Sequence, residues 1–196
     1  MENQNIRQIL AIMATDIVNY TETMNDNEDK AWEYLKKQRN IIKPTVSKMN
    51  GQMFKEMGDG TFSKFRSAIE AVKCAIKIQE EAHSNDLPLR IAVHLGDVMD
   101  DGIDVIGMGV NIANRIQQLA NPGNIVVSDD VWSQIRGQSD MEGRSIGEQD
   151  IKGYHKSVEV YELTYNPDGS VTQKVKVTET VTITDEEGKK VTAEKA

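Results

Sequence analysis

A nearly continuous apolar run, QILAIMATDIV at residues 8–18, constrains the possible folds of this chain more than any other stretch. Its length and continuity are typical of a strand buried inside a sheet, and it falls short of the roughly 20 residues that span a bilayer. The chain has 196 residues, enough for one domain with a substantial core around this strand and for an extension. Near the end of the run stands a carboxylate, Asp16.

A second carboxylate, Asp59, stands between Gly58 and Gly60 in the stretch GQMFKEMGDGTFSKF at residues 51–65. Apolar runs on both sides of a Gly-Asp-Gly triplet are typical of a tight hairpin, in which glycine supplies the positive φ that such turns need. The turn alone has two interpretations. It is either a purely structural turn or a carboxylate presented to a ligand that the bare glycines allow to approach.

If the strand and the hairpin are neighbours in one sheet, Asp16 and Asp59 lie at the same edge. Two carboxylates placed together repel each other unless a cation or a proton stands between them. Carboxylate oxygens suit Mg²⁺ or Mn²⁺, which bind through one or two carboxylates and the phosphates of a substrate. The pair therefore indicates how an acidic protein, with a net charge of -8, binds an anionic ligand.

Helical and extended segments alternate along the rest of the chain. Helical spacing predicts a helix with Trp32, Leu35, Ile41 and Ile42 that stops near Pro44 or shortly after, and another over residues 67–82. Residues 89–98, 124–128 and 158–163 are expected to be strands, and Asp129 or Asp130 to cap a short helix containing Trp132. This order lacks a strict βαβ period, so we expect an α+β sheet domain.

The segment GVNIANRIQQLANPG predicts a further helix, from about Gly109 to Ala120. Ile112, Ile116 and Leu119 share one stripe of it, and Asn111 and Arg115 lie together on its flank. One interpretation is a buried amide and an arginine bordering the core. The other is a functional pair, because an amide and a guanidinium one turn apart can hold a hydroxyl and stabilise phosphate charge.

Composition excludes several other functions. An acidic chain with 5 % aromatic residues does not fit a nucleic-acid binder that uses a basic face or an aromatic sheet surface. The single cysteine, Cys74, cannot form an internal disulfide and is expected in the core. The polar N-terminus lacks a signal-peptide pattern and no segment predicts a membrane span, so we expect a cytoplasmic protein.

The last part of the chain differs in character. Asn166-Pro167-Asp168-Gly169 predicts a turn, and valine and isoleucine then alternate loosely with threonine and lysine as far as Thr184. We therefore divide the chain into a domain at 1–165 and an extension at 166–196. The extension is either a β-ribbon or a flexible charged tail.

The chain contains four motifs in a characteristic order: TDIVNYT at 15–21, KEMGDG at 55–60, IAVHLGD at 91–97 and DVIGMGVNIANR at 104–115. Together they resemble the class III nucleotide cyclases, in particular a bacterial adenylate cyclase catalytic domain. The resemblance covers about residues 8–164. It implies a ferredoxin-like cyclase core with an antiparallel-rich sheet and flanking helices, and it makes the extension an addition to that core.

The resemblance also implies roles for individual residues. Asp16 and Asp59, with the carbonyl of Ile17, would bind two Mg²⁺ or Mn²⁺ ions. Asn111 would orient the ribose and Arg115 would stabilise the pentavalent phosphorus. Lys55 and Asp104 match the pair that selects the base. Lys152 matches a phosphate-binding lysine near the end of the family's domain, and Lys156 is an alternative for that role. His94 is expected to be structural.

The implied reaction is conversion of ATP to 3′,5′-cyclic AMP and pyrophosphate by in-line attack of the ribose 3′-OH on the α-phosphate. The implied assembly is a homodimer with two sites, in which Asp16 and Asp59 of one protomer face the other named residues of its partner. Two alternatives remain, a guanylate cyclase of the same fold and a catalytically silent nucleotide-binding partner. A diguanylate cyclase is excluded because the chain has no GGDEF-like stretch.

Overall fold

The computed structural model describes residues 6–138, 141–164, 180–184 and 190–194. Eight strands form the main sheet: β1 (Ile6–Ile17), β2 (Gln52–Met57), β3 (Gly60–Phe65), β4 (Leu89–Asp100), β5 (Val105–Ile106), β6 (Ile125–Ser128), β7 (Glu142–Asp150) and β8 (Ser157–Thr164). Five helices accompany it: α1 (Tyr20–Asp26), α2 (Glu28–Lys48), α3 (Ala68–Ser84), α4 (Met108–Gln117) and α5 (Asp129–Ile135).

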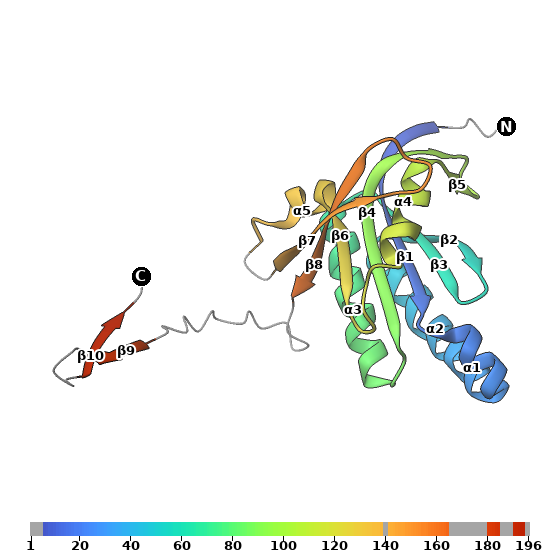
Figure 1. The fold of residues 1–196 in the computed structure, drawn as a ribbon. Coiled ribbons are helices and arrows are strands. Elements are labelled where there is room, and N and C mark those ends of the chain that lie inside the picture. The colour runs from blue at the N-terminus through green and yellow to red at the C-terminus, as the bar shows by residue number, and fades with distance from the viewer. Residues whose placement is uncertain (1–5, 139–140, 165–179, 185–189, 195–196) are drawn as a thin grey trace.

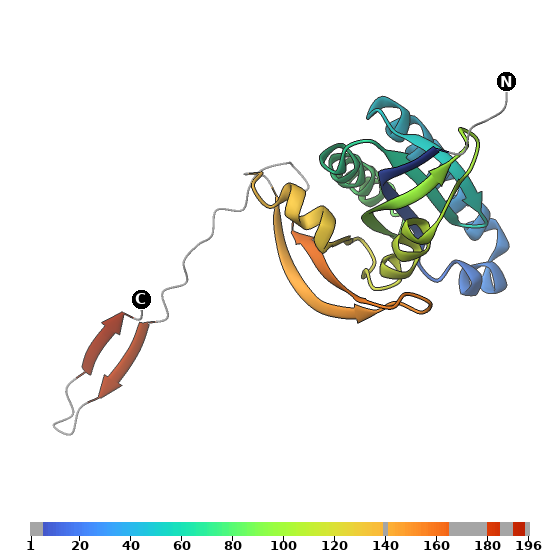
Figure 2. The same cartoon turned by 90° about the horizontal axis from the view of Figure 1, so that it is seen from above.

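The strand order in the main sheet is β2-β3-β1-β4-β6-β8-β7, and the short β5 pairs with β4 (Figure 1). All the pairs are antiparallel except β4 with β6, which is parallel. At one edge β7 and β8 form a long curved hairpin, which is clearest from above (Figure 2). The α+β class and the antiparallel-rich sheet predicted from the sequence are confirmed.

The predicted buried strand is β1, and its side chains alternate between two apolar cores. Ala11 and Met13 face the core that contains residues of α2 and α3, while Leu10, Ile12 and Ala14 belong to a second core that includes Ala113 of α4. A strand covered on both faces has no polar face, which explains the continuous apolar run. Every residue from Leu10 to Ala14 is 4 % exposed or less.

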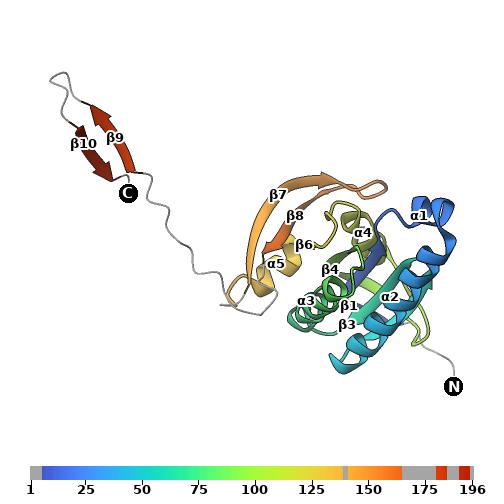
Figure 3. The same cartoon turned by 90° about the horizontal axis from the view of Figure 1, so that it is seen from below.

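The helices cover the two faces of the sheet unequally. Helices α2 and α3 pack against each other on one face (Figure 3), while α4 lies on the opposite face against β4 and β1 (Figure 1). Ser67 caps α3 by accepting a hydrogen bond from the backbone N–H of Glu70. The apolar spacing of α3 is confirmed, since Val72, Ala75 and Ile78 are fully buried, as is Cys74.

The region after β1 contains two helices, α1 and α2, where the sequence predicted one. Helix α2 contains Pro44 and ends at Lys48, which agrees with an end shortly after the proline. A proline near the end of a long helix removes one hydrogen bond, and burial of Thr45 and Val46 offsets that loss. Trp32 lies in this helix as predicted, but it is 51 % exposed and does not belong to the core.

Other local predictions were wrong or incomplete. The N-cap of α5 is Ser128, and Asp129 and Asp130 lie in the first turn, so neither caps the helix. Strand β7 was missed because its sequence, EGRSIGEQD, is polar and edge-exposed. No helix within the described residues is both long and apolar enough to span a membrane.

The extension contains two short strands, β9 (Thr180–Thr184) and β10 (Lys190–Glu194), which pair antiparallel in a separate sheet. The pairing agrees with the ribbon interpretation for these ten residues. The predicted turn at 166–169 and the residues up to 179 lie outside the described part of the chain, and the division at residue 165 stays a prediction.

Candidate active site

The end of β1 and the tip of the β2–β3 hairpin bring Asp16 and Asp59 together. The hairpin turns through Gly58 and Asp59, with Gly58 at φ +64°, a backbone conformation that glycine adopts without strain. Strand β3 pairs with β1 so that Thr61 is opposite Thr15, and the two buried hydroxyl oxygens lie 2.8 Å apart. The predicted hairpin and the predicted meeting of the two carboxylates at one edge are both present.

The two carboxylates interact strongly. Burial, the charge of Asp16 and a hydrogen bond with Asp16 together raise the pKa of Asp59 to about 6. Hydrogen bonds from the backbone of Asp59 and Ile17 act in the opposite direction and only partly offset it. A carboxyl group that is this costly to ionise is stabilised by a nearby cation.

Arg90, at the start of β4, already supplies one positive charge at this site. Its Nε and Nη2 donate hydrogen bonds of 3.0 and 2.7 Å to Asp16, and both bonds go to the same oxygen, Oδ2. Arg90 is directly opposite Asp16 in the β1–β4 pairing. It therefore orients this carboxylate while leaving Oδ1 out of the ion pair. Arg90 immediately precedes the IAVHLGD motif, but no sequence pattern singled it out.

Gln38, on α2, holds the tip of the hairpin from the other side. Its side-chain Nε2 donates a 2.5 Å hydrogen bond to the backbone carbonyl of Asp59. Gln38 is fully buried, and its Oε1 has no hydrogen-bond partner among the described residues. Burying the unpaired Oε1 costs free energy, so the hydrogen bond from Nε2 is the contact that accounts for a glutamine at this position. It ties the tip of the hairpin to α2. No sequence pattern distinguished Gln38 from the other polar residues of the helix.

The donor set at this edge fits a divalent ion that also binds substrate. The described residues contain no group of three or more histidine, cysteine, aspartate or glutamate side chains that could hold a metal. Two carboxylates alone suit Mg²⁺ or Mn²⁺ when phosphate oxygens and water complete the coordination shell. A cation bound between the two carboxylates would offset the burial and the repulsion from Asp16 that raise the pKa of Asp59.

Lys55 and Asp104 form a second group, separate from the carboxylate pair. Lys55 lies on β2, Asp104 immediately precedes β5, and Lys55 Nζ is 3.2 Å from Asp104 Oδ2. Both side chains are partly exposed, at 37 % and 41 %. Residues 49 positions apart in the sequence thus present a donor and an acceptor side by side, as the predicted base-selecting pair requires.

Asn111 and Arg115 lie one turn apart on α4, and both are exposed. The buried side of the helix is formed by Ile112, Ala113 and Ile116, whereas Leu119, predicted on the same stripe, is 38 % exposed because α4 ends at Gln117. Within the described residues, the side chains of Asn111 and Arg115 form no hydrogen bond or ion pair.

Two glycines set how closely α4 approaches the sheet. A Cβ on Gly96 of β4 would lie 3.0 Å from the Cα of Gly109 and 2.8 Å from His94 Nε2. Only residues without side chains allow this contact, which explains why glycines occur in both the HLGD and GMGVN stretches. The orientation of Asn111 and Arg115 therefore depends on this glycine contact.

Lys152, Lys156 and His94, the remaining residues singled out from the sequence, lie apart from the two groups described above. Lys152 and Lys156 are both exposed in the connection between β7 and β8, where no contact within the described residues joins either to the other candidate residues. His94 is buried, its Nδ1 is 2.9 Å from Ser128 Oγ, and burial lowers its pKa to about 4. A neutral, enclosed histidine agrees with the structural role expected for it.

Comparisons with known proteins identify the family of this chain. A family model described as the adenylate and guanylate cyclase catalytic domain matches residues 1–165. A protein of Rhizobium meliloti (strain 1021), provisionally named adenylate cyclase 3, is 34 % identical over 170 residues, covering 82 % of this chain and 29 % of that protein. The chain thus spans less than a third of this relative's length.

Solved structures share the fold over most of the chain. An adenylate/guanylate cyclase/hydrolase from Silicibacter pomeroyi is 28 % identical, with a TM-score of 0.75, and the match covers 83 % of this chain and all of that one. The adenylyl cyclase CyaB from P. aeruginosa has a TM-score of 0.76 at 21 % identity, over 83 % and 97 % of the two chains.

Proposed function

This chain belongs to the adenylate and guanylate cyclase catalytic domain family, the class III nucleotide cyclases, and from that membership we propose that it is an adenylate cyclase. The reaction is conversion of ATP to 3′,5′-cyclic AMP and pyrophosphate, which makes the enzyme a phosphorus–oxygen lyase. The observation that carries the proposal is the Lys55–Asp104 pair, because it matches adenine rather than guanine.

The two bases present opposite hydrogen-bonding groups. Adenine has an acceptor at N1 and a donor at its 6-amino group, which suit the lysine donor and the aspartate acceptor. Guanine has a donor at N1 and an acceptor at O6, so it would leave polar groups unmatched in the pocket. Each unmatched buried group costs about 1–3 kcal/mol, which together gives roughly 100-fold discrimination or more.

The remaining residues act on the triphosphate and the ribose. Asp16, Asp59 and the carbonyl of Ile17 would hold two Mg²⁺ or Mn²⁺ ions, which supply activation of the 3′-OH and neutralisation of phosphate charge. Asn111 orients the ribose so that its 3′-oxygen is in line with the α-phosphorus. A bond forms between the 3′-oxygen and the α-phosphorus while the bond from that phosphorus to the oxygen bridging the β-phosphate breaks, so that pyrophosphate leaves with the bonding electrons and the 3′-OH proton passes to water. Arg115 stabilises the charge on the phosphoryl oxygens.

The assembly that we propose is a homodimer with two shared sites. Two features support it: Asn111 and Arg115 are open to solvent, and exposed apolar side chains lie on one face of β1, β4 and β5. They are Ile9, Met99 and Ile106, which are 68 %, 37 % and 51 % exposed, and the Arg7–Asp97 ion pair lies among them. Exposed apolar side chains bordered by charged residues are typical of a protein interface.

The direct test is incubation of the protein with ATP and Mn²⁺, followed by identification of the products by mass spectrometry. We expect 3′,5′-cyclic AMP and pyrophosphate in equal amounts, no product in EDTA, and no product from the Arg115→Ala variant. Release of ADP or linear AMP, or an absence of turnover in the folded dimer, would contradict the proposal.

A further inference from the structure

The connection between β4 and β5, residues 101–104, is a four-residue turn that carries Asp104. Asp100 pairs with Val105 and Met99 with Ile106, so the turn is closed at its base by the two strands. The backbone N–H of Asp101 also donates to the carbonyl of Asp104, at 3.3 Å. The position of Asp104 thus depends on how rigidly this turn is held.

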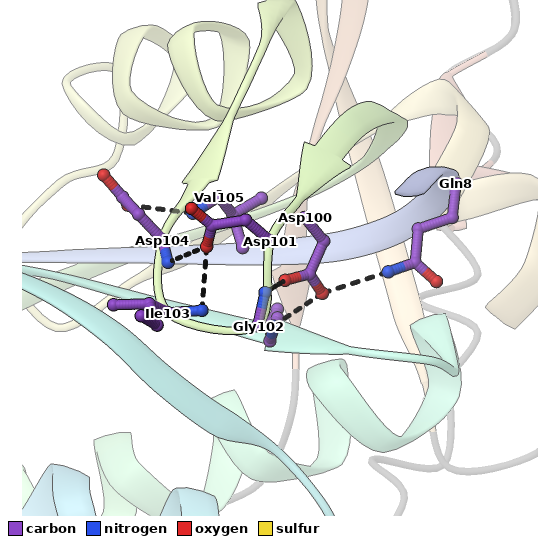
Figure 4. A network of polar contacts seen from close by, with 8 residues as sticks. Gln8, Asp100, Asp101, Gly102, Ile103, Asp104 and Val105 are labelled. Atoms are coloured by element: carbon purple, nitrogen blue, oxygen red, sulfur yellow. Dashed lines mark hydrogen bonds and ion pairs between the residues drawn. The ribbon is translucent and has the colours of Figure 1, made fainter. Parts of the chain in front are cut away.

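Asp101 holds the turn from within (Figure 4). Its Oδ1 accepts hydrogen bonds of 2.8 Å from the backbone N–H of Ile103 and of 2.8 Å from that of Asp104. These bonds keep the pKa of Asp101 below its usual value. Aspartate and asparagine commonly stabilise turns in this way, because their side-chain oxygen replaces a backbone acceptor.

The same turn fixes the direction of the Asp104 carboxylate. Its Oδ1 accepts a 2.8 Å hydrogen bond from the backbone N–H of Val105, and its Oδ2 faces Lys55 Nζ. One oxygen is therefore bound to the backbone, and the other is directed toward the position at which a base would be read. Moving the backbone at residues 104–105 would move both oxygens.

Asp100 anchors the turn to the rest of the sheet. Its Oδ2 accepts 2.5 Å and 3.0 Å hydrogen bonds from Lys64 Nζ and Gln8 Nε2, and its Oδ1 accepts from the backbone N–H of Gly102. Burial alone raises the pKa of Asp100, but the bonds from Lys64 and Gly102 outweigh it and leave the pKa below its usual value. Lys64 and Asp100 are about one-tenth exposed, at 10 % and 11 %.

Two ion pairs thus join this turn to the β2–β3 hairpin. The Lys64–Asp100 pair is enclosed, whereas the Lys55–Asp104 pair is open to solvent. When a base takes over the hydrogen bonds of Lys55 and Asp104, the open pair separates. The enclosed pair and the Asp101 bonds do not involve those two groups, so they keep the turn in place.

We propose that Asp101 is a positioning residue for base selection, which acts by holding Asp104 at the geometry that recognises adenine. This inference rests on the proposed adenylate cyclase function and extends it to a residue that does not touch the substrate. A side chain displaced by about 1 Å can lose up to a hundredfold in rate, so a loosened turn should reduce discrimination between the bases.

The test compares Asp101→Ala with Asp101→Asn, because asparagine keeps the side-chain oxygen that accepts both backbone N–H groups. Each protein is given equal ATP and GTP with Mn²⁺ in one reaction, and the ratio of cyclic AMP to cyclic GMP gives the ratio of kcat/KM. We expect the alanine variant to lose about tenfold in this ratio and the asparagine variant less than about twofold. Thermal unfolding and size-exclusion chromatography check that both variants fold and dimerise.

A second measurement does not depend on turnover. Hydrogen exchange at the amides of residues 103 and 104 should become faster in Asp101→Ala than in Asp101→Asn, because only the alanine variant loses the acceptor. Faster exchange with an unchanged product ratio would overturn the positioning role. Unchanged exchange would show that Asp101 does not hold the turn.

The wild-type protein, measured in the same competition, distinguishes failure of the Asp101 role from failure of the proposed adenylate cyclase function. A wild-type protein that forms no cyclic nucleotide, or forms both equally, would refute the proposed function and the positioning role together. A wild-type protein that prefers ATP, alongside an alanine variant with the same preference, would refute the role of Asp101 alone.

Discussion

The proximity of Asp16 and Asp59 predicts that removing one charge stabilises the metal-free protein. Asp59→Asn replaces the carboxylate with a neutral group of the same shape, which removes the repulsion from Asp16 and the cost of burying a charge. The variant should therefore unfold at a higher temperature than the wild-type protein at neutral pH. It should also lose the proposed cyclase activity, because the substitution removes a proposed metal ligand.

The size of the effect follows from the pKa of Asp59, which rises from 3.8 to about 6. A difference of about 2 units at 1.36 kcal/mol each corresponds to about 3 kcal/mol. Asp59 is only partly buried, so solvent screening reduces this to on the order of 1 kcal/mol. For a chain of this length, the melting temperature should rise by about 2–4 °C.

The effect has a defined pH dependence. Asp59 has a higher pKa in the folded state than in the unfolded state, so the folded state binds more protons between about pH 4 and pH 6. Its contribution to the free energy of unfolding falls as the pH rises through this interval and is fully unfavourable above about pH 6. The stabilisation by Asp59→Asn should therefore be small at pH 4 and largest at pH 7–8.

The assay is thermal unfolding followed by circular dichroism, in EDTA, at several pH values between 4 and 8. Asp150→Asn, which removes one exposed carboxylate at the end of β7, controls for the change in net charge. Adding Mn²⁺ should raise the melting temperature of the wild-type protein and of this control but not that of Asp59→Asn. An Asp59→Asn protein that is no more stable than wild type at pH 7.5, or whose difference does not vary with pH, would refute the reasoning.

Three further predictions concern the assembly, the base and the extension. Mixing equal amounts of Asp59→Ala and Arg115→Ala, each inactive alone, should restore about a quarter of wild-type activity. After exchange half the dimers contain one protomer of each kind, and one of the two sites in such a dimer is intact. Dimers that exchange subunits without regaining activity would contradict shared sites. Replacing Lys55 by Glu and Asp104 by Cys should erode the preference for ATP in kcat/KM, and an unchanged preference would exclude these residues from base selection. Ending the chain at residue 165 should spare metal-dependent activity, because no metal or phosphate ligand is expected beyond that residue. A truncated protein that is folded and dimeric but inactive would show that the extension takes part in catalysis.

Sequence reasoning predicted those parts of the fold whose residues follow a single physical rule. The apolar run became β1 because a strand covered on both faces excludes polar residues, and Gly58 marked the hairpin because the turn requires a positive φ. Helix α2 ends at Lys48, shortly after Pro44 as predicted, because a proline so near the end of a helix costs little where Val46 is buried. Strand β7 was missed because an edge strand satisfies its backbone through β8 without an apolar face.

In the candidate site, too, the sequence predicted the residues that lie in local motifs and not those that depend on contacts between distant segments. Asp16, Asp59, Lys55 and Asp104 fall in recognisable motifs, and the structure brings each pair together. The residues that orient them do so through contacts between distant parts of the chain. Gln38 reaches the Asp59 carbonyl from a helix 21 residues away, and no spacing in the sequence marks such a contact.

The most direct test of adenylate cyclase activity is a competition between the two nucleotides in one reaction. Equal concentrations of ATP and GTP are supplied with Mn²⁺ to the unmodified protein, and cyclic AMP and cyclic GMP are quantified by mass spectrometry at low conversion. The Lys55–Asp104 pair predicts an excess of cyclic AMP of roughly 100-fold or more. Equal amounts of the two products, or an excess of cyclic GMP, would contradict the assignment of ATP as the substrate.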